Sequence, residues 1–305
     1  MRKKLCLALA LALLTTGCSG LGLWLSIAGR APDDPTQEQP VQAGVQPEPP
    51  ARPAVEPVEL WDPAALALSA REGRYRLRDP FGSGEELPLP EEVTQAACEV
   101  AVTDLSVQGR TLYVALLRLP YGKAPNGALY RSTDQGEHWD LLCLPELALG
   151  EEEQVADLFL SFWSEEGGSL VVETDLARRL IWCTADGGSS WSLDAVQESG
   201  DPDAWLCGGG FVSGQMGFLA STADGQTAPQ VSITRDGGLT WQPLPMELPE
   251  LPGLLRAEAL TPQCIGEAVV LPVRVYQSGA GAAQQVRLLQ YITRDGGETW
   301  AFADD

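Results

Sequence analysis

Four copies of one eight-residue motif constrain the fold of this chain more than any other feature. The copies read STDQGEHW, TADGGSSW, TRDGGLTW and TRDGGETW, and all four fit S/T-x-D-x-G-x-x-W. Their aspartates are 52, 50 and 59 residues apart, and such a near-constant interval indicates a repeat architecture. The motif residues are Ser132, Asp134, Gly136 and Trp139; Thr184, Asp186, Gly188 and Trp191; Thr234, Asp236, Gly238 and Trp241; and Thr293, Asp295, Gly297 and Trp300.

The chemistry of the motif is that of a β-hairpin turn. An aspartate carboxylate accepts hydrogen bonds from turn amides, the glycine permits a positive φ, and the serine or threonine hydroxyl adds a local bond. The tryptophan then begins the next strand and buries its indole between neighbouring sheets. We therefore expect these residues to be structural rather than catalytic.

Each repeat has room for four short strands. In the first repeat the strands are expected at 102–108, 111–119, 128–133 and 138–144, and in the second at 155–162, 169–174, 180–184 and 190–196. A repeated four-stranded antiparallel unit of this length is typical of a propeller blade. The fold class predicted is thus all-β, a β-propeller with four clear blades, and Leu60 to Pro90 offers a partial fifth, with candidate strands at 74–79 and 85–90.

On these motifs the chain resembles the BNR/Asp-box propellers, a group that includes sialidases, sortilin-type receptors, photosystem assembly factors and some polysaccharide hydrolases. The resemblance covers Glu92 to Asp305 and implies a fold, not an activity. It also implies that ligands bind on the face opposite the Asp-box turns. Charged and aromatic residues expected in the loops of that face are Arg118, Tyr121, Asp175, Arg178 and Tyr276. Such residue types suit a glycan or protein ligand, and they are equally common in solvated loops.

No catalytic set is evident in the sequence, and no catalytic residue is assigned. The one histidine, His138, lies inside an Asp box, which argues against Ser/His/Asp chemistry. A sialidase-like hydrolase would need three arginines, a tyrosine nucleophile and an acid, and the nearest match to its arginine motif, Leu117 to Pro120, lies too late in the first repeat. A hydrolase with two carboxylates stays open as an alternative, because acidic residues are plentiful.

The charge and the spacing of acidic residues and cysteines limit which ligands and partners the sequence predicts. The formal net charge of −22 repels phosphate backbones, so no nucleic-acid partner is expected. The acidic strings 151–153 and 201–203 lack a complete calcium-loop pattern, and neither a metal nor a cofactor is predicted. The cysteines form no CxxC pair, which favours small buried side chains, with one disulfide left open.

The N-terminal segment is predicted to export and tether the chain. Residues 1–29 have a basic start and an apolar run, and LLTTGC resembles a lipoprotein lipobox in which Cys18 would be lipidated. The alternative is an uncleaved membrane anchor. Residues 30–57 are rich in Pro, Gln and Glu and read as a disordered spacer, which leaves 58–305 for the propeller.

Together these features predict a membrane-tethered, extracytoplasmic and non-catalytic module that binds a protein, peptide or glycan. The alternative is an exo-acting glycoside hydrolase that uses the same face of the propeller.

Overall fold

The computed structural model describes residues 55–69, 72–95, 101–119, 126–198, 201, 203–279 and 284–303, all within one compact unit, Arg52–Asp305. The predicted signal or anchor with Cys18, most of the spacer, and Tyr121 lie outside the described residues. Among the described residues, no helix has the length and apolar character needed to traverse a lipid bilayer.

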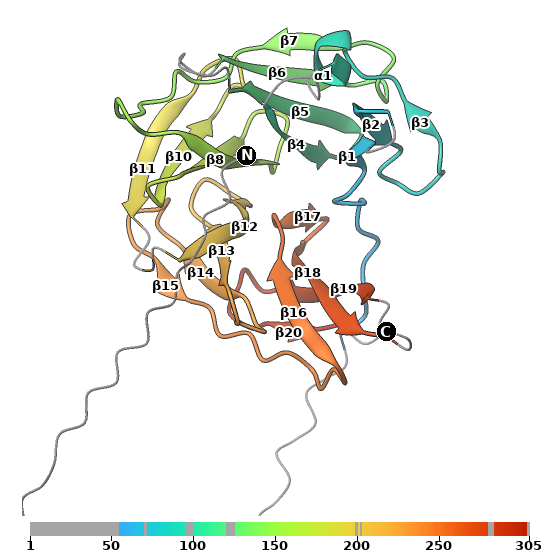
Figure 1. Cartoon of the computed structure of the whole chain (residues 1–305), viewed down its shortest axis with the longest axis vertical. Helices are drawn as coiled ribbons and strands as arrows, with labels where there is room; N and C mark the ends of the chain where they lie inside the picture. The colour runs from blue at the N-terminus through green and yellow to red at the C-terminus, as the bar shows by residue number, and fades with distance from the viewer. Residues whose placement is uncertain are drawn as a thin grey trace, which may run out of the picture. The chain divides into compact units, whose positions relative to one another are not determined.

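Five antiparallel sheets surround a common axis, and the fold is a five-bladed β-propeller (Figure 1). The prediction of an all-β propeller is confirmed, and the strands expected in the first two repeats are present with ends shifted by a few residues. The second blade contains β4 Ala101–Gln108, β5 Thr111–Arg118, β6 Asn126–Ser132 and β7 Asp140–Leu142, and the third contains β8 Val155–Phe162, β9 Gly168–Thr174, β10 Arg178–Thr184 and β11 Ser192–Glu198.

The last two blades repeat this order from the axis outward. The fourth contains β12 Ala204–Phe211, β13 Gly217–Ala223, β14 Gln230–Thr234 and β15 Gln242–Pro243. The fifth contains β16 Leu254–Ala259, β18 Ala268–Ser278, β19 Gln284–Thr293 and β20 Ala301–Phe302, and β17 Gln263–Ile265 adds a second segment beside β18.

The first blade is the partial one. It consists of β1 Leu66–Ser69, β2 Arg74–Arg78 and β3 Glu86–Leu87, followed by the short helix α1 Glu91–Gln95. The indole of Trp139 donates to the carbonyl of Pro88, just after β3, as that of Trp191 donates to Cys143, just after β7. This correspondence makes β3 an outermost strand, so the strand that the first blade lacks is its innermost one.

A degenerate fifth turn supports this alignment. Asp79 lies between β2 and β3, where an Asp box would fall, and accepts hydrogen bonds from the amides of Phe81 and Ser83, both at 3.1 Å. The serine or threonine and the tryptophan of the motif are absent at this turn, so the sequence pattern did not reveal it.

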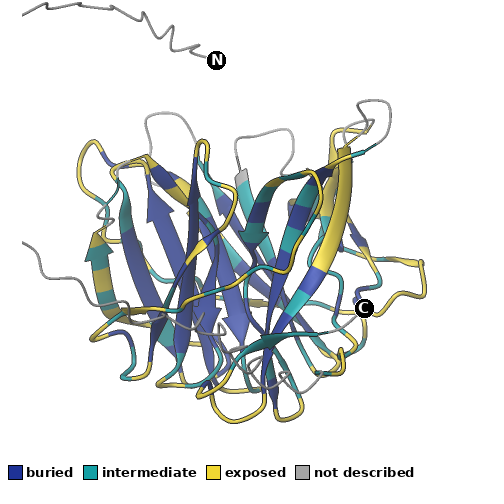
Figure 2. Cartoon of the chain, turned by 90° about the horizontal axis from the view of Figure 1, so that it is seen from below, coloured by how far each residue is buried: buried dark blue, intermediate teal, exposed yellow. Residues whose placement is uncertain are grey.

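The core lies between adjacent sheets, where apolar side chains alternate with the strand period. Figure 2 shows the buried strands between two exposed rims of loops. Between the second and third blades, for example, Tyr113 stacks on Phe162 with ring centroids 3.7 Å apart. Such packing fixes each blade relative to the next.

An extended N-terminal segment connects the last blade to the first. Val55 pairs with Ala303, and the backbone of Val58 exchanges two hydrogen bonds with the side chain of Gln290, at 2.9 and 2.8 Å. The carbonyl of Trp61 accepts from Gln263 at 3.1 Å. We call residues 55–61 the latch. The predicted boundary between spacer and propeller, 57/58, falls inside it.

Candidate functional site

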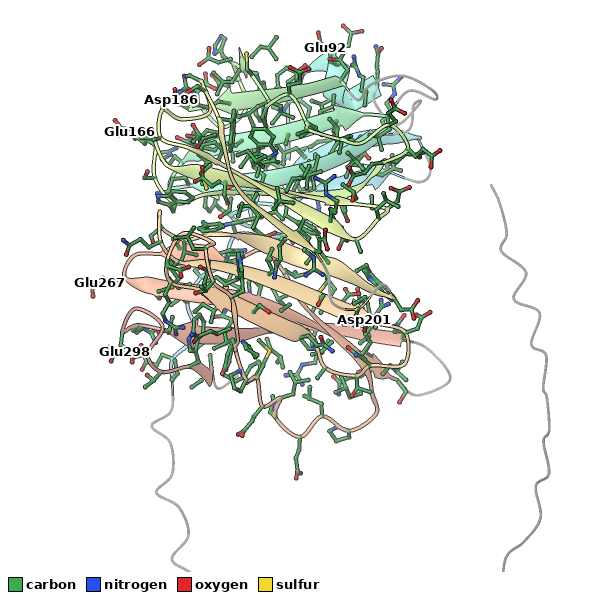
Figure 3. All side chains as sticks on the ribbon, turned by 90° about the vertical axis from the view of Figure 1, so that its left-hand side faces the viewer. Glu92, Glu166, Asp186, Asp201, Glu267 and Glu298 are labelled. Atoms are coloured by element: carbon green, nitrogen blue, oxygen red, sulfur yellow. The ribbon has the colours of Figure 1, made fainter. Side chains whose placement is uncertain are left out.

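The Asp-box turns occupy one face of the propeller, here called the box face. In the side view, Asp186 and Glu298, both from box turns, lie on the same side as Glu166 and Glu267 from the other hairpin turns, and Asp201 lies on the opposite side (Figure 3). That opposite face, called the loop face, carries the remaining connections. The two faces therefore differ in which loops they present.

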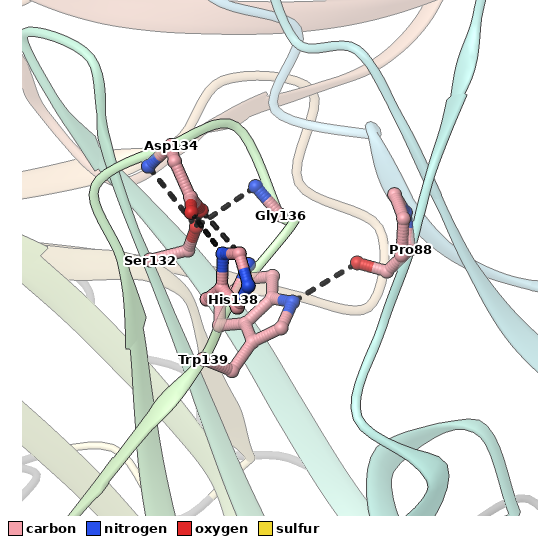
Figure 4. A network of polar contacts seen from close by, with 6 residues as sticks. All are labelled: Pro88, Ser132, Asp134, Gly136, His138 and Trp139. Atoms are coloured by element: carbon pink, nitrogen blue, oxygen red, sulfur yellow. Dashed lines mark hydrogen bonds and ion pairs between the residues drawn. The ribbon is translucent and has the colours of Figure 1, made fainter.

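Each box closes its turn by the same hydrogen bonds (Figure 4). The Ser132 hydroxyl accepts the Gly136 amide at 2.8 Å and donates to Asp134 at 2.9 Å. The Asp134 carboxylate accepts a hydrogen bond from the backbone amide four residues later, that of His138, at 2.9 Å. In the other boxes the corresponding donors are Ser190, Thr240 and Thr299.

The carboxylates of the boxes are held ionised by these bonds. The backbone amide of His138, followed by its ring, lowers the pKa of Asp134 to about 2. Hydrogen bonds from hydroxyl side chains, Ser190, Thr240 and Thr299 respectively, lower the pKa of Asp186, Asp236 and Asp295. The carboxylates thus serve their own turns.

One box groups residues of metal-binding type. Asp134, Glu137 and His138 bring a ligand atom each to within 4.8 Å of one another. Both oxygens of Asp134 already accept protein hydrogen bonds, and Glu137 and His138 are exposed. Neither observation favours a dedicated metal site there.

The four tryptophans use their indole N–H groups in two ways. Trp139 and Trp191 donate to the outer strand of the preceding blade, as described above. Trp241 and Trp300 donate to a glycine carbonyl of their own box, at 3.1 and 3.2 Å. In the last three blades each indole also packs edge-on against a phenylalanine: Phe162, Phe211 and Phe218.

The residues predicted for the ligand face are placed in three surroundings, one of which Asp175 and Arg178 share between β9 and β10. Arg118 donates to the carbonyl of Glu92 at 3.2 Å, and Asp175 accepts the amide of Gln154 at 2.9 Å. Arg178 forms an ion pair with the buried carboxylate of Glu153. Tyr276 donates to Glu258 at 2.9 Å, near the axis. The structure therefore brings Asp175 and Arg178 together and places Arg118 and Tyr276 elsewhere.

The arginines also fail to form the clamp that a sialidase-like hydrolase requires. Arg256 and Arg274 share Glu258, whereas Arg178 pairs with Glu153 and Arg118 holds the α1 connection. The four arginines are thus held by three different partners, and their guanidinium groups are not gathered around one ligand position.

Two carboxylates near the axis join neighbouring blades. An innermost strand is a sheet edge, so the amides on its unpaired side need hydrogen-bond partners from outside its own sheet. Asp104 on β4 accepts the amide of Leu160 on β8 at 2.7 Å, and Glu173 on β9 accepts that of Leu206 on β12 at 2.9 Å. These carboxylates supply the missing partners.

Burial makes both carboxylates harder to ionise. Burial raises the pKa of Asp104 to about 7, against the opposing hydrogen bonds from Leu160 and Leu105, and nearby Asp157 raises it further. Burial likewise raises the pKa of Asp157 and Glu173. Arg179 lies 3.6 Å from Glu173, and both side chains are buried.

A second polar group lies on the inner strands of the last blade. Glu258 on β16 accepts the Tyr276 hydroxyl and lies 3.2 Å from Arg256 and 3.9 Å from Arg274. The guanidinium of Arg256 lies over the Tyr276 ring, 4.5 Å from its centroid, as in a cation–π contact. All four side chains belong to the loop-face half of their strands.

Sequence reasoning missed Asp104 and Glu258. Each interrupts a largely apolar strand, in VTDLSV and LRAEAL, and an acidic residue inside such a strand was the available signal. It could not be interpreted without knowing which strand is innermost.

The cysteines are thiols in the described part of the chain. Cys143, Cys183, Cys207 and Cys264 are unpaired there, and Cys143 is exposed, contrary to the expectation of buried cysteines. Burial raises the pKa of Cys183 and Cys207 to about 12 and that of Cys264 to about 11, so these thiols are poor nucleophiles.

One comparison with known protein families agrees with the repeat. The BNR/Asp-box repeat family model matches residues 291–302, the last box. No curated protein sequence matches the chain. A galactosidase of the GH43 type shares 10% identity with a TM-score of 0.49, over 80% of this chain and 88% of that one.

Two further solved structures are more distant in shape. The α-L-arabinanase of Penicillium chrysogenum shares 13% identity with a TM-score of 0.40, over 65% of this chain and 63% of that one. The sialidase of Trypanosoma rangeli shares 12% identity with a TM-score of 0.38, over 81% of this chain and 41% of that one. This chain thus spans less than two thirds of either protein. The chain is a five-bladed β-propeller with four Asp boxes, the last of which matches the BNR/Asp-box repeat model.

Proposed function

We propose that this chain is a membrane-tethered, extracytoplasmic binding module that engages its ligand through the loop face of the propeller. The lipobox-like sequence around Cys18 supports the tether, and the proline-rich spacer would hold the propeller away from the lipid. The ligand is a protein, peptide or glycan.

The observation that carries the proposal is the polar group of Arg256, Glu258, Arg274 and Tyr276. These side chains are partly exposed and mutually oriented, and they offer two guanidinium groups and an aromatic ring. Such groups recognise carboxylates and polar ligands. On the box face, by contrast, the aspartates are occupied by their own turns.

The hydrogen bonds and ion pairs that the carboxylates near the axis already make support binding over catalysis. A general acid or base needs an oxygen directed at the substrate. Asp104 and Glu173 each give an oxygen to an amide of the next blade, and Glu258 receives Tyr276 and Arg256.

The test presents the purified full chain, in detergent micelles, to peptide and glycan arrays and to a panel of aryl glycosides. We expect retention of an arrayed ligand, no glycoside turnover, and weaker retention by Arg274→Gln. Arg110→Gln, an exposed arginine in the β4–β5 turn of the box face, is the matched control. Glycoside turnover at enzymatic rates would overturn the proposal.

A glycoside hydrolase is the second candidate, favoured by one observation. Asp104 and Asp157 lie on neighbouring inner strands, interact electrostatically, and both have raised pKa values, as a shared acid and base would. This candidate predicts turnover that both Asp104→Asn and Asp157→Asn abolish.

A further inference from the structure

The sheet of the last blade has two faces with different surroundings. One face, with Leu271, Val273 and Val275 of β18, is buried against the fourth blade. The alternate residues of the same strand face the other way, toward the first blade, because successive side chains of a strand point to opposite sides. This second face is the subject of the inference.

The latch covers only half of that second face. Near the box face, Ala268, Val270 and Ile292 are buried and pack against Val55 and Val58. Toward the loop face, six side chains form two cross-strand rows over β16, β18 and β19. The rows are Arg256–Tyr276–Val286 and Glu258–Arg274–Leu288, and we call these six residues the seam wall.

The seam wall is accessible to solvent. Arg256 and Arg274 expose 42% and 29% of their side chains, and Glu258 exposes 12%. Val286 and Leu288, on the adjoining strand β19, are 57% and 39% exposed. Figure 2 shows exposed strand next to buried strand in this blade, in line with the burial pattern of β19.

Elsewhere in the ring, such rows are covered by the next blade. In the second blade the row at the same distance from the Asp box is Val102–Leu117–Gly127. Leu117 is only 3% exposed and packs in the cluster shared with the third blade. In the last blade the middle residue of this row is Arg274, and the outer residue is the exposed Leu288.

The missing inner strand of the first blade explains the difference. Its sheet begins with β1 and packs Leu77 against the second blade. The alternate residues, Arg74, Arg76 and Arg78, are exposed on its other side. The first and last blades are therefore joined by the latch, and two solvated surfaces flank the seam toward the loop face.

The seam wall has a charged part on β16 and β18 and an aliphatic part on β19. Near the axis it has two guanidinium groups and one carboxylate, an excess of positive charge in a chain of net charge −22. One strand further out it is aliphatic. A ligand that matches both parts has a carboxylate next to an apolar group, about one strand spacing, roughly 5 Å, away.

We propose that the seam wall binds an acidic peptide segment, with a carboxylate between Arg256 and Arg274 and a neighbouring apolar side chain on Val286 and Leu288. This inference rests on the proposed function and specifies its ligand class. An acidic peptide matches the charge and the aliphatic row together, whereas a uronic-acid glycan would leave the aliphatic row without an apolar partner.

The experiment measures binding to the full chain in detergent micelles by isothermal titration calorimetry. The probe is an N-acetylated octapeptide of alternating glutamate and leucine, and a glutamine–leucine octapeptide and an oligoglucuronate are the comparison ligands. We expect saturable binding of the acidic peptide, and a Kd at least tenfold larger for Arg274→Gln and for Leu288→Ser. Arg110→Gln should leave the Kd unchanged, and melting curves should show that all variants are folded.

The outcomes separate the inference from the function on which it rests. No binding of the acidic peptide, or binding that Arg274→Gln leaves unchanged, overturns the seam wall as the site. Oligoglucuronate binding without peptide binding also overturns it, yet leaves the module a ligand-binding one. Glycoside turnover without binding of either probe would overturn both the seam wall as a peptide site and the proposed binding function.

Discussion

At the scale of single residues, one hydroxyl organises each Asp box. Thr234 is 1% exposed, accepts the amides of Asp236 and Gly238, and donates to the Asp236 carboxylate. The bond to Gly238, at 2.9 Å, is buried. Loss of this hydroxyl leaves an amide without a partner, and such an amide is costly because water does not replace the bond.

Thr234→Val is therefore expected to destabilise the fold by about 1 to 3 kcal/mol, since the valine keeps the shape and removes the acceptor. Urea unfolding measures the change, and Thr227→Val, at an exposed position, is the control. An unfolding midpoint equal to that of the parent would contradict the assigned role of the box.

Asp104 gives the fold a pH dependence of the opposite sign to that of the boxes. Its pKa in the folded chain, about 7, is above the ordinary value of 3.8. The stability that protonated Asp104 contributes is thus fully present below about pH 4 and is lost as the pH rises toward 7. The box aspartates have lowered pKa values, so their contribution is lost only in acid.

We predict that Asp104→Asn flattens the pH dependence of stability between about pH 4.5 and 7. The interval from 3.8 to about 7 corresponds to at most roughly 4 kcal/mol, and Asn keeps an acceptor for the Leu160 amide. The free energy of unfolding is compared for both proteins across this range, with exposed Asp224→Asn as control. Parallel pH profiles for parent and D104N would refute the prediction.

At the scale of elements, the innermost strands and the latch solve the same problem, which is an exposed strand edge. Side chains of one blade bond the inner-strand amides of the next, as Ser106 does for Phe162 and Ser169 for Phe211, at 2.8 and 3.0 Å. The latch uses Gln290 in the same manner, because the first blade offers no inner strand there.

Gln290→Ala is expected to loosen the latch and to destabilise the propeller by about 1 to 3 kcal/mol, because it removes both partners of the Val58 backbone. Hydrogen exchange should rise at Val58 and in the adjoining part of β18. Gln285→Ala, exposed on the same strand, should change neither. Unaltered exchange at Val58 in Q290A would show that the latch is held by its apolar contacts alone.

At the scale of the whole molecule, net charge works against compactness. With 42 acidic and 20 basic residues, the chain repels itself at neutral pH. Salt shortens the screening distance from about 30 Å at 0.01 M to about 10 Å at 0.1 M, which weakens that repulsion.

Raising the NaCl concentration from about 0.01 to 0.1 M is thus expected to raise Tm by about 2 °C or more, which is on the order of 1 kcal/mol for a domain of this size. Calorimetry at neutral pH measures the shift, and sucrose at matched osmolality controls for solvent effects. A fall in Tm would mean that ion pairs such as Arg178–Glu153 outweigh the repulsion.

The sequence by itself determined the architecture. The box residues act within eight positions of the chain, and alternation places strand residues with a period of two, so both are readable locally. The RYRLRD and EELPLP stretches were correctly given strands, whereas β1 and the Asp79 turn lacked the pattern that the other blades share.

The tertiary structure alone decided which residues meet. Arg118, Asp175, Arg178 and Tyr276 share a face, yet only Tyr276 reaches Glu258, because distance from the axis depends on strand order and not on loop membership. The exposure of Arg274 and Leu288 depends in turn on a strand missing from the first blade, more than 190 residues earlier in the chain. A packing surface is defined by its neighbour, and here the first blade lacks the inner strand that would lie against it.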